Sequence, residues 1–338
     1  MGRRKIRVGV IFGGRSGEHD VSLRSARAVM GALDPERFEV VPLGITREGR
    51  WLTSGDPLMQ LEAGSELARL EGRAGGEDPG ATGTALATTG SATPPPFTGG
   101  DPAASHGAID VVFPVLHGPR GEDGTMQGLL ELADVPYVGA GVLASAVAMD
   151  KAITKTILAQ HGIPQAPWLQ LLARDWARDR AAVEGRIARE LGYPCFVKPA
   201  NMGSSVGISK VKHAGELAAA LDLAAHYDRK LVIEAGVDAR ELEISVLGND
   251  DPIASAISEI IPTHEFYDYE AKYVDEDGAQ FALPADIPRE KAEELRDLAI
   301  RSYKAIDCAG MARVDFFLER GTGRLLLNEI NTIPGFTA

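Results

Sequence analysis

Short apolar runs alternate with amphipathic stretches along the first part of the chain. Residues 7–12 (RVGVIF) form a β-branched run that ends in two glycines, which is typical of a buried strand followed by a tight loop. Residues 22–33 then show helical spacing, and we predict Ser22 as the N-cap. Apolar runs at 38–45 and 109–116 predict two further strands. This order of strand, glycine-rich turn, helix and strand predicts a parallel α/β sheet.

The second half of the chain predicts shorter strands separated by helices. Asp150 is the predicted N-cap of a helix that continues through Gln160. Further strands are predicted at 195–198, 207–211, 231–234, 241–247, 311–318 and 324–330, and further helices at about 215–227 and 288–306. A glycine-containing turn at 321–323 joins the last two strands, so we expect them to pair as an antiparallel ribbon.

Residues 72–107 interrupt this pattern. Gly, Pro, Ala, Ser and Thr fill 29 of these 36 positions, including three consecutive prolines. Such a segment buries too little apolar surface to offset the entropy lost when it becomes ordered. We therefore expect a disordered surface insertion here and assign it no function.

The composition argues against nucleic acids and membranes as binding partners. The 338 residues are 44% hydrophobic and 25% charged, with a formal net charge of -13. This acidic balance argues against nucleic-acid binding, so a bound polyanion must be held by a few placed cations. The weakly polar run at 138–149 is too short to cross a bilayer, and we interpret the N-terminal residues as a first strand and not as an export signal. We predict a cytoplasmic protein without a membrane partner.

Residues that can carry chemistry are most concentrated in the last two predicted strands. Arg313 and Asp315 alternate with apolar residues in MARVDFFL, and Glu329 and Asn331 do so in LLLNEIN. Two antiparallel strands can therefore present two carboxylates, one amide oxygen and one guanidinium on one surface. Such oxygen ligands beside an anion-binding group suit Mg²⁺ bound to polyphosphate. The alternative is a solvated face with ordinary cross-strand ion pairs.

A lysine followed by a Gly/Ser loop is the second candidate. Lys198 ends an apolar strand, and residues 200–207 (ANMGSSVG) follow. Backbone amides in such a loop suit phosphate oxygens, with the lysine at one side. The lysine precedes the glycines, so this is not a P-loop, and an ordinary turn is the alternative. Lys151 follows the predicted cap Asp150 and is either a phosphate ligand or an exposed helix lysine.

Four further residues lie at the ends of predicted strands. Glu234 and Glu241 could accept hydrogen bonds from adenine or ribose, or could belong to a polar strand face. Glu18 follows the first strand, where open α/β sheets bind ligands, and its carboxylate would suit a substrate ammonium group. His117 follows the third strand, although a single histidine is more often structural. The glycines near Glu18 do not form G-x-G-x-x-G, which argues against a dinucleotide site.

Together these motifs resemble the ATP-grasp superfamily and, within it, the D-alanine–D-alanine ligase family. The resemblance is carried by GGRSGEHDVS (13–22), HGPRGEDGTMQG (117–128), YVGAGVLASAVAMDK (137–151), FVKPANMGSSVGISKV (196–211), FYDYEAKY (266–273), MARVDFFL (311–318) and LLLNEINTIPG (325–335). It implies an α/β protein whose N-terminal Rossmann-like parallel-sheet domain, 1–139, precedes a two-subdomain ATP-grasp fold of α+β type. The two subdomains are expected at 140–233 and 234–338. The second is expected to lack a final helix that follows this last motif in the family.

The resemblance also implies an activity. Members of the family join two D-alanines through a D-alanyl phosphate, using ATP, for bacterial peptidoglycan precursors. The implied cofactors are ATP and Mg²⁺, with Mn²⁺ as an alternative ion, the small-molecule substrate is D-alanine, and the implied assembly is a homodimer. Another ATP-grasp carboxylate–amine ligase and a nucleotide-binding remnant without catalysis are the alternatives.

The resemblance assigns nucleotide and metal contacts residue by residue. The implied metal ligands are Asp315, Glu329 and Asn331. The implied ATP contacts are Lys151 and Lys198 at the phosphates, Ser204 and Ser205 in the loop, Glu234 at adenine and Glu241 at ribose.

Substrate contacts are implied in the same way. Glu18 would bind the first D-alanine's ammonium with His117 nearby, and Lys272 would face the carboxylate of the second substrate. Ser204 and Tyr273 would link to Glu18 and close the site, within a lid at about 263–283. Arg313 and the Gly335 N–H would stabilise the oxyanion. The pair Lys272–Tyr273 favours an amine over a hydroxy acid as the second substrate.

Overall fold

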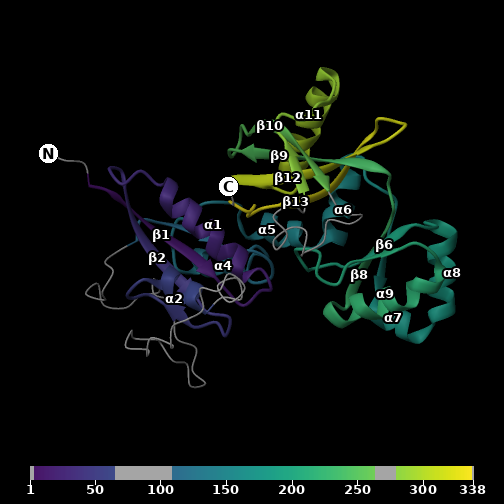
Figure 1. The fold of residues 1–338 in the computed structure, drawn as a ribbon, viewed down its shortest axis with the longest axis horizontal. Coiled ribbons are helices and arrows are strands. Elements are labelled where there is room, and N and C mark those ends of the chain that lie inside the picture. The colour runs from purple at the N-terminus through teal and green to yellow at the C-terminus, as the bar shows by residue number, and fades with distance from the viewer. Residues whose placement is uncertain (1–3, 65–108, 263–278, 337–338) are drawn as a thin grey trace. The chain divides into compact units, whose positions relative to one another are not determined.

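The computed structural model describes residues 4–64, 109–262 and 279–336. These residues belong to two compact units, of which unit 1 comprises Met1–Val142 and Ile333–Ala338, and unit 2 comprises Leu143–Thr332 (Figure 1). Both units contain helices and strands, in agreement with the predicted α/β class. The predicted insertion at 72–107, together with Lys272 and Tyr273, lies outside the described residues. The predicted domain boundaries stay predictions.

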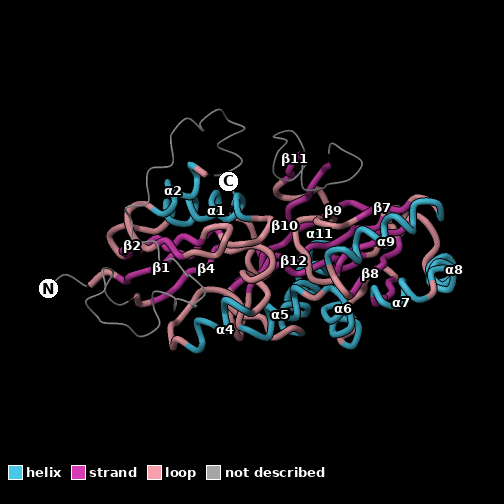
Figure 2. Tube along the Cα trace, turned by 90° about the horizontal axis from the view of Figure 1, so that it is seen from below, coloured by secondary structure: helices cyan, strands magenta, loops and turns pink. Residues whose placement is uncertain are grey.

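Unit 1 is built on a four-stranded sheet with the order β3-β2-β1-β4. The strands β1 (Ile6–Gly13), β2 (Phe38–Ile45) and β4 (Val111–Val115) are parallel, as predicted, and β3 (Trp51–Leu52) pairs with the end of β2. Helices α1 (His19–Ala32) and α2 (Pro57–Ala63) lie on one face, and α4 (Thr125–Leu132) lies on the other (Figure 2). Both faces of the sheet are therefore covered.

Alternation along β1 explains this layered arrangement. Val8, Val10 and Phe12 pack with residues of α1 and α2, whereas Ile11 packs with residues of α4. Successive side chains of a strand point to opposite faces, so an almost continuous apolar run is what a sheet covered on both sides requires.

The predicted N-cap Ser22 is wrong. Helix α1 begins at His19 with Glu18 at the cap position, so Ser22 lies inside the helix. The buried Ser22 hydroxyl accepts a hydrogen bond from the Gly13 N–H at 2.8 Å and donates to the Val115 carbonyl. Its partners on β1 and β4 are tertiary ones, and local helix-start patterns cannot reveal them.

The first sheet of unit 2 has the order β5-β8-β6-β7. Its antiparallel strands are β5 (Trp168–Leu172), β8 (Lys230–Ala235), β6 (Cys195–Pro199) and β7 (Ser209–Val211). One face packs against α7 (Ala173–Arg178), α8 (Arg180–Glu190) and α9 (Ala214–Tyr227) through a core that includes Trp176 and Leu221. On the other face, Val232 packs with Ala152 of α6 (Lys151–Gln160), which follows α5 (Val142–Met149).

The second sheet of unit 2 has the order β11-β10-β9-β12-β13 and is antiparallel. Its strands are β9 (Ala239–Leu247), β10 (Ile253–Pro262), β11 (Ala279–Ala282), β12 (Met311–Glu319) and β13 (Leu325–Asn331). Helix α11 (Arg289–Ala305) contacts β9, β10 and β12. The predicted ribbon of β12 and β13 is confirmed, and its turn contains Gly321 and Gly323, both at positive φ. Among the described residues, the structure has no helix long and apolar enough to cross a membrane.

The predicted cap of α6 is confirmed. The Asp150 side chain accepts from the backbone N–H of Ala152 at 3.2 Å and of Ile153 at 3.1 Å. The same carboxylate forms an ion pair with Lys230 at the start of β8, and both side chains are largely buried. Asp150 therefore caps α6 and also links the start of this helix to β8 through an ion pair.

We expect Asp150→Ala to lower the free energy of unfolding by about 3 kcal/mol, because it removes the cap and leaves the Lys230 ammonium without its carboxylate. Asp179→Ala is the matched control, since Asp179 caps α8 through Ala182 N–H at 3.0 Å but is exposed. That substitution should cost about 1 kcal/mol. Urea unfolding followed by circular dichroism measures both losses, and equal losses would contradict the added role of the ion pair.

Candidate active site

The terminal ribbon brings four predicted residues together. Arg313 pairs in register with Asn331, and Asp315 pairs with Glu329, so all four lie on one face of β12 and β13. The Arg313 guanidinium donates to both carboxylate oxygens of Asp315 at 2.8 Å, and Asn331 Nδ2 donates to Asp315 at 2.9 Å. The common face predicted from the alternation is therefore confirmed, while the metal and oxyanion roles of these residues stay predictions.

Glu243 is a fifth member of this cluster, a place that was not predicted for it. It lies on β9 directly opposite Asp315, and its Oε1 is 3.1 Å from Arg313 Nε. Burial disfavours the charged form of Arg313, but Asp315 and Glu243 together raise the pKa of the guanidinium above its usual value. The alternation in RELEIS places Glu241 and Glu243 on one face, which was the available signal.

A second charged cluster surrounds the Glu234 carboxylate. Glu234 is 3% exposed, and its two oxygens lie 2.8 Å from Lys198 Nζ and 3.1 Å from Lys155 Nζ. Lys198 comes from β6, Glu234 from the neighbouring β8, and Lys155 from α6. Lys155, 2% exposed, was not predicted, although it follows Lys151 by one helical turn. Three elements thus meet at one buried acid.

The charges in this cluster shift one another's pKa values. Burial alone would raise the pKa of Glu234, but the two ammonium groups lower it to about 2. Burial lowers the pKa of Lys155, and Glu234 opposes that shift. The charge of Glu329 acts on both Lys155 and Arg313. The charges around Glu234 and the charges around Arg313 therefore influence one another within unit 2.

The Gly/Ser loop adopts a strained backbone beside these lysines. Ser204 and Ser205 have φ values of 45° and 60°, in the left-handed region that side chains rarely adopt. Gly207 has φ 72°, and a Cβ there would lie 2.6 Å from Tyr227 Cδ2, so a close approach requires glycine. Lys151 Nζ donates to the Met202 carbonyl at 2.6 Å. Such strain is concentrated at ligand sites and fits a phosphate-binding loop.

The base of the loop is held by an acid from the turn before β8. Asp228 accepts from both the backbone N–H and the side-chain amide of Asn201, at 2.9 and 2.8 Å. Its other oxygen accepts from the backbone N–H of Lys230 at 3.0 Å. These bonds fix the place where the loop leaves β6.

In unit 1 the structure places Glu18, His117 and the Gly335 segment around the end of β4. Glu18 is buried, and a Cβ on Gly118 would lie 2.4 Å from Glu18 Oε2, so glycine at this position lets the carboxylate approach. His117 Nδ1 lies 3.0 Å from the carbonyl oxygen of Ile333, two residues before the exposed Gly335. The carboxylate and imidazole predicted to face the first substrate are therefore neighbours.

The other predicted residues that the structure describes belong to unit 2. They are Lys151, Lys198, Ser204, Ser205, Glu234, Glu241, Arg313, Asp315, Glu329 and Asn331. Glu241 lies two residues before Glu243 on β9 and so shares its face of the sheet. Its ribose role stays a prediction.

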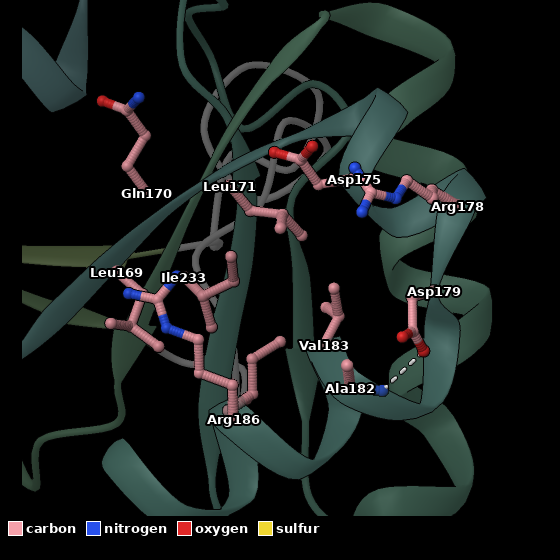
Figure 3. A pocket seen from close by; sticks show the side chains of 11 residues that line it. Leu169, Gln170, Leu171, Asp175, Arg178, Asp179, Ala182, Val183, Arg186 and Ile233 are labelled. Atoms are coloured by element: carbon pink, nitrogen blue, oxygen red, sulfur yellow. Dashed lines mark hydrogen bonds between the residues drawn. The ribbon is translucent and has the colours of Figure 1, made fainter.

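The sheet of β5, β8, β6 and β7 has a pocket on the face opposite to the Glu234 side chain. Figure 3 shows Ile233, Leu171 and Val183 lining it, between β5, β8 and α8. Neighbours along a strand point to opposite faces, so Glu234 points away from this pocket. The residues predicted for the site do not line it.

The residues of the β12–β13 ribbon suit a Mg²⁺ ion that is held by few protein ligands. Among the described residues, no three or more His, Cys, Asp or Glu side chains are grouped to hold a metal. Mg²⁺ is commonly held by one or two carboxylates together with water and substrate phosphates. Asp315 and Glu329 provide two such carboxylates. Asn331 donates to Asp315 through its side-chain nitrogen, so its amide oxygen is not used in that bond and could serve as a third oxygen ligand.

One antiparallel sheet that presents lysines and a strained loop, and a second that presents carboxylates and a guanidinium, make unit 2 an ATP-grasp fold, as predicted. The chain belongs to the D-alanine–D-alanine ligase family. Residues 7–140 match the family model described as D-ala D-ala ligase N-terminus, and residues 157–338 match that of the D-ala D-ala ligase C-terminus. The resemblance seen in the motifs is thereby confirmed.

Individual relatives agree with this assignment. The D-alanine–D-alanine ligase of Thermoanaerobacter sp. (strain X514) is 51% identical over 333 residues, which are 98% of this chain and 89% of that protein. The enzyme of Geobacillus kaustophilus is 49% identical over 340 residues, covering 98% and 87%.

Solved structures are similar over nearly the whole chain. The D-alanine–D-alanine ligase from Coxiella burnetii has a TM-score of 0.79 at 35% identity, covering 99% of this chain and 86% of that one. A D-Ala:D-Ser ligase from Enterococcus faecalis has a TM-score of 0.78 at 33% identity, covering 99% and 92%.

The ion pairs of Glu234 predict a pH-dependent contribution to stability. Its pKa is about 2 in the folded state against an ordinary 4.5, so the ionised carboxylate stabilises the fold above pH 4.5, and this contribution is lost as the pH falls toward 2. The difference in unfolding free energy between wild type and Glu234→Gln should therefore shrink by about 2 kcal/mol between pH 7 and pH 3.

Urea unfolding at several pH values measures this difference. Glu319→Gln is the control, because Glu319 forms an exposed ion pair with Arg324 that solvent screens. Its difference from wild type should change much less with pH. A constant difference for Glu234→Gln would show that the two lysines do not stabilise the ionised form.

Proposed function

We propose that this protein uses ATP to join two D-alanines into D-alanyl-D-alanine for peptidoglycan precursors. The observation that carries the proposal is the cluster on the terminal ribbon, where Arg313 lies between Asp315 and Glu243 and beside Glu329. Membership of the ligase family gives this cluster its reaction. A carboxylate becomes an acyl donor to an amine only after one of its oxygens is converted into a leaving group; phosphorylation by ATP does this, and phosphate leaves when the amine attacks.

The ATP phosphates are the first charge that the chain must neutralise. We assign them to Lys151 and Lys198, with the backbone of the loop at Ser204 and Ser205. Lys198 is oriented by Glu234, and Lys151 is oriented by the Met202 carbonyl, so neither ammonium group has to be ordered by ATP alone. Glu234 and Glu241 are assigned to the adenine and the ribose.

The divalent ion belongs beside the phosphates. Asp315, Glu329 and Asn331 would hold it, and when bound, Mg²⁺ or Mn²⁺ supplies charge stabilisation at the transferring phosphoryl group. Arg313 carries a fixed positive charge on the same face, where it stabilises the oxyanion that forms when the amine attacks. Its bidentate bond with Asp315 fixes the plane of the guanidinium.

The first D-alanine is assigned to unit 1. Glu18 offers a buried carboxylate for the ammonium group, His117 lies at the end of β4, and the Gly335 N–H is assigned to the oxyanion. Lys272 and Tyr273 enter the proposal through their sequence motif alone. Lys272 is assigned to the carboxylate of the second substrate, and Tyr273, with Ser204, is assigned to closing the site. We propose a homodimer in the cytoplasm as the working form.

The second substrate is tested directly. The likeness to a D-Ala:D-Ser ligase makes D-serine a competing second substrate, and D-lactate tests the preference for an amine. Phosphate release and product mass should show D-alanyl-D-alanine as the main product when D-alanine, D-serine and D-lactate are offered together. ATP binding without D-alanine-dependent phosphate release would contradict the proposed function.

Arg313→Ala should reduce kcat at least 100-fold, because it removes the charge that we assign to the oxyanion. ATP affinity, measured by calorimetry, should stay within threefold. Arg324→Ala is the control on the same ribbon, since Arg324 pairs with Glu319 at its exposed end, and it should leave kcat unchanged. Turnover within a few-fold of wild type for Arg313→Ala would remove this residue from the mechanism.

A further inference from the structure

One face of α1 carries polar side chains where a buried helix face is normally apolar. Glu18, Ser22 and Ser25 follow one another at i, i+4 and i+7, and they are 7%, 0% and 0% exposed. A buried hydroxyl without partners is costly, so each serine must be explained by what it binds. The proposed function uses only Glu18.

The two serines bind different parts of unit 1. Ser22 bonds Gly13 N–H and the Val115 carbonyl, and so joins the ends of β1 and β4. Ser25 Oγ lies 3.1 Å from His117 Nε2 and accepts from the backbone N–H of Phe336 at 3.1 Å. Ser25 therefore contacts the segment that contains Gly335, and Ser22 does not.

The hydrogen bonds of Ser25 and His117 form a continuous chain between Phe336 and Ile333. The Ile333 carbonyl can only accept, so His117 Nδ1 carries the proton of that 3.0 Å bond. Nε2 lies 3.1 Å from Ser25 Oγ and accepts from the Ser25 hydroxyl when it carries no proton itself. Ser25 Oγ in turn accepts from the Phe336 N–H. The chain from Phe336 through Ser25 and His117 to Ile333 closes a ring around residues 334–335.

The ring leaves the enclosed turn little freedom. Pro334 has a φ fixed by its own ring, and Gly335 is the remaining residue between the two held groups. The Phe336 ring packs edge-on against Phe113 of β4, with 5.6 Å between centroids. Gly335 itself is exposed, so its conformation is set by the bonds on either side of it.

We infer that Ser25 is a positioning residue for the Gly335 N–H, which it holds in place through His117 and Phe336. The inference rests on the proposed function in one respect, the assignment of that N–H to the oxyanion. In this arrangement His117 acts as a link between α1 and the turn, and its two ring nitrogens are both used by the protein. A donor placed before the reaction begins costs no reorganisation when charge develops.

Ser25→Ala tests the inference by two independent readouts. Amide hydrogen exchange of a peptide that covers residues 333–336 should become at least tenfold faster, because Phe336 N–H loses its acceptor. The kcat for D-alanyl-D-alanine synthesis should fall at least tenfold, while the KM for ATP stays within threefold, since the residues assigned to ATP belong to unit 2.

Ser22→Ala is the matched control, because it removes an equally buried hydroxyl from the same helix face without touching the turn. It should lower overall stability and leave both the exchange of residues 333–336 and kcat near the wild-type values. Ser25→Cys is a second variant that keeps the side-chain size but bonds weakly, so it separates lost hydrogen bonds from a cavity. It should reproduce the faster exchange and the lower kcat.

Each outcome decides the inference. Unchanged exchange in both Ser25 variants would show that the ring does not hold the turn. Faster exchange with an unchanged kcat would show that the held turn does not serve the reaction. Equal effects from Ser22→Ala would reduce the role of Ser25 to general stability. If the wild type lacks D-alanine-dependent turnover, the proposed function fails, and the exchange data alone still decide whether Ser25 holds the turn.

Discussion

The Glu234 carboxylate is buried, and its charge must be compensated within unit 2. This requirement constrains how the elements around it are arranged. A buried charge is tolerated only when opposite charges lie at hydrogen-bond distance, and here Lys155 and Lys198 provide them. Meeting this need brings α6, β6 and β8 to one point. The Gly/Ser loop leaves β6 directly after Lys198, so the same contact also places the loop. The position of the Gly/Ser loop and the burial of this carboxylate are therefore linked in unit 2.

The same rule acts through hydroxyl groups in unit 1. Ser22 and Ser25 bury polar groups on a helix face that would otherwise be apolar, and their bonds reach the ends of β1 and β4 and the turn after Ile333. Polar groups that must be satisfied accept few geometries, because hydrogen bonds weaken steeply with angle and distance. A site that must hold donors in fixed places gains from such contacts, whereas apolar packing alone tolerates more shift.

Local patterns in the sequence predicted much of this. Several strands with alternating or continuous apolar residues were found because their period is set by the backbone, although β5 and β10 were not predicted. The Asp150 cap was found because capping is a local interaction. The pairing of Arg313 and Asp315 with Asn331 and Glu329 was predictable because a tight turn joins the two strands. Ser22 was misassigned because the same residue type serves caps and tertiary bonds. Lys155 and Glu243 were missed because their partners are distant in sequence.

The sequence by itself determined the positions of the elements that it predicted, the residues that share a face of those strands, and the family, because these depend on short-range periodicity and on motifs that keep their spacing. Only the tertiary structure decided which polar and charged groups from distant parts of the chain meet. Lys155 and Glu234 are 79 residues apart, and Ser25 and Phe336 are 311 apart. Which distant groups pair is decided when burial excludes water and each remaining polar atom must take the partner that the packed chain puts within reach.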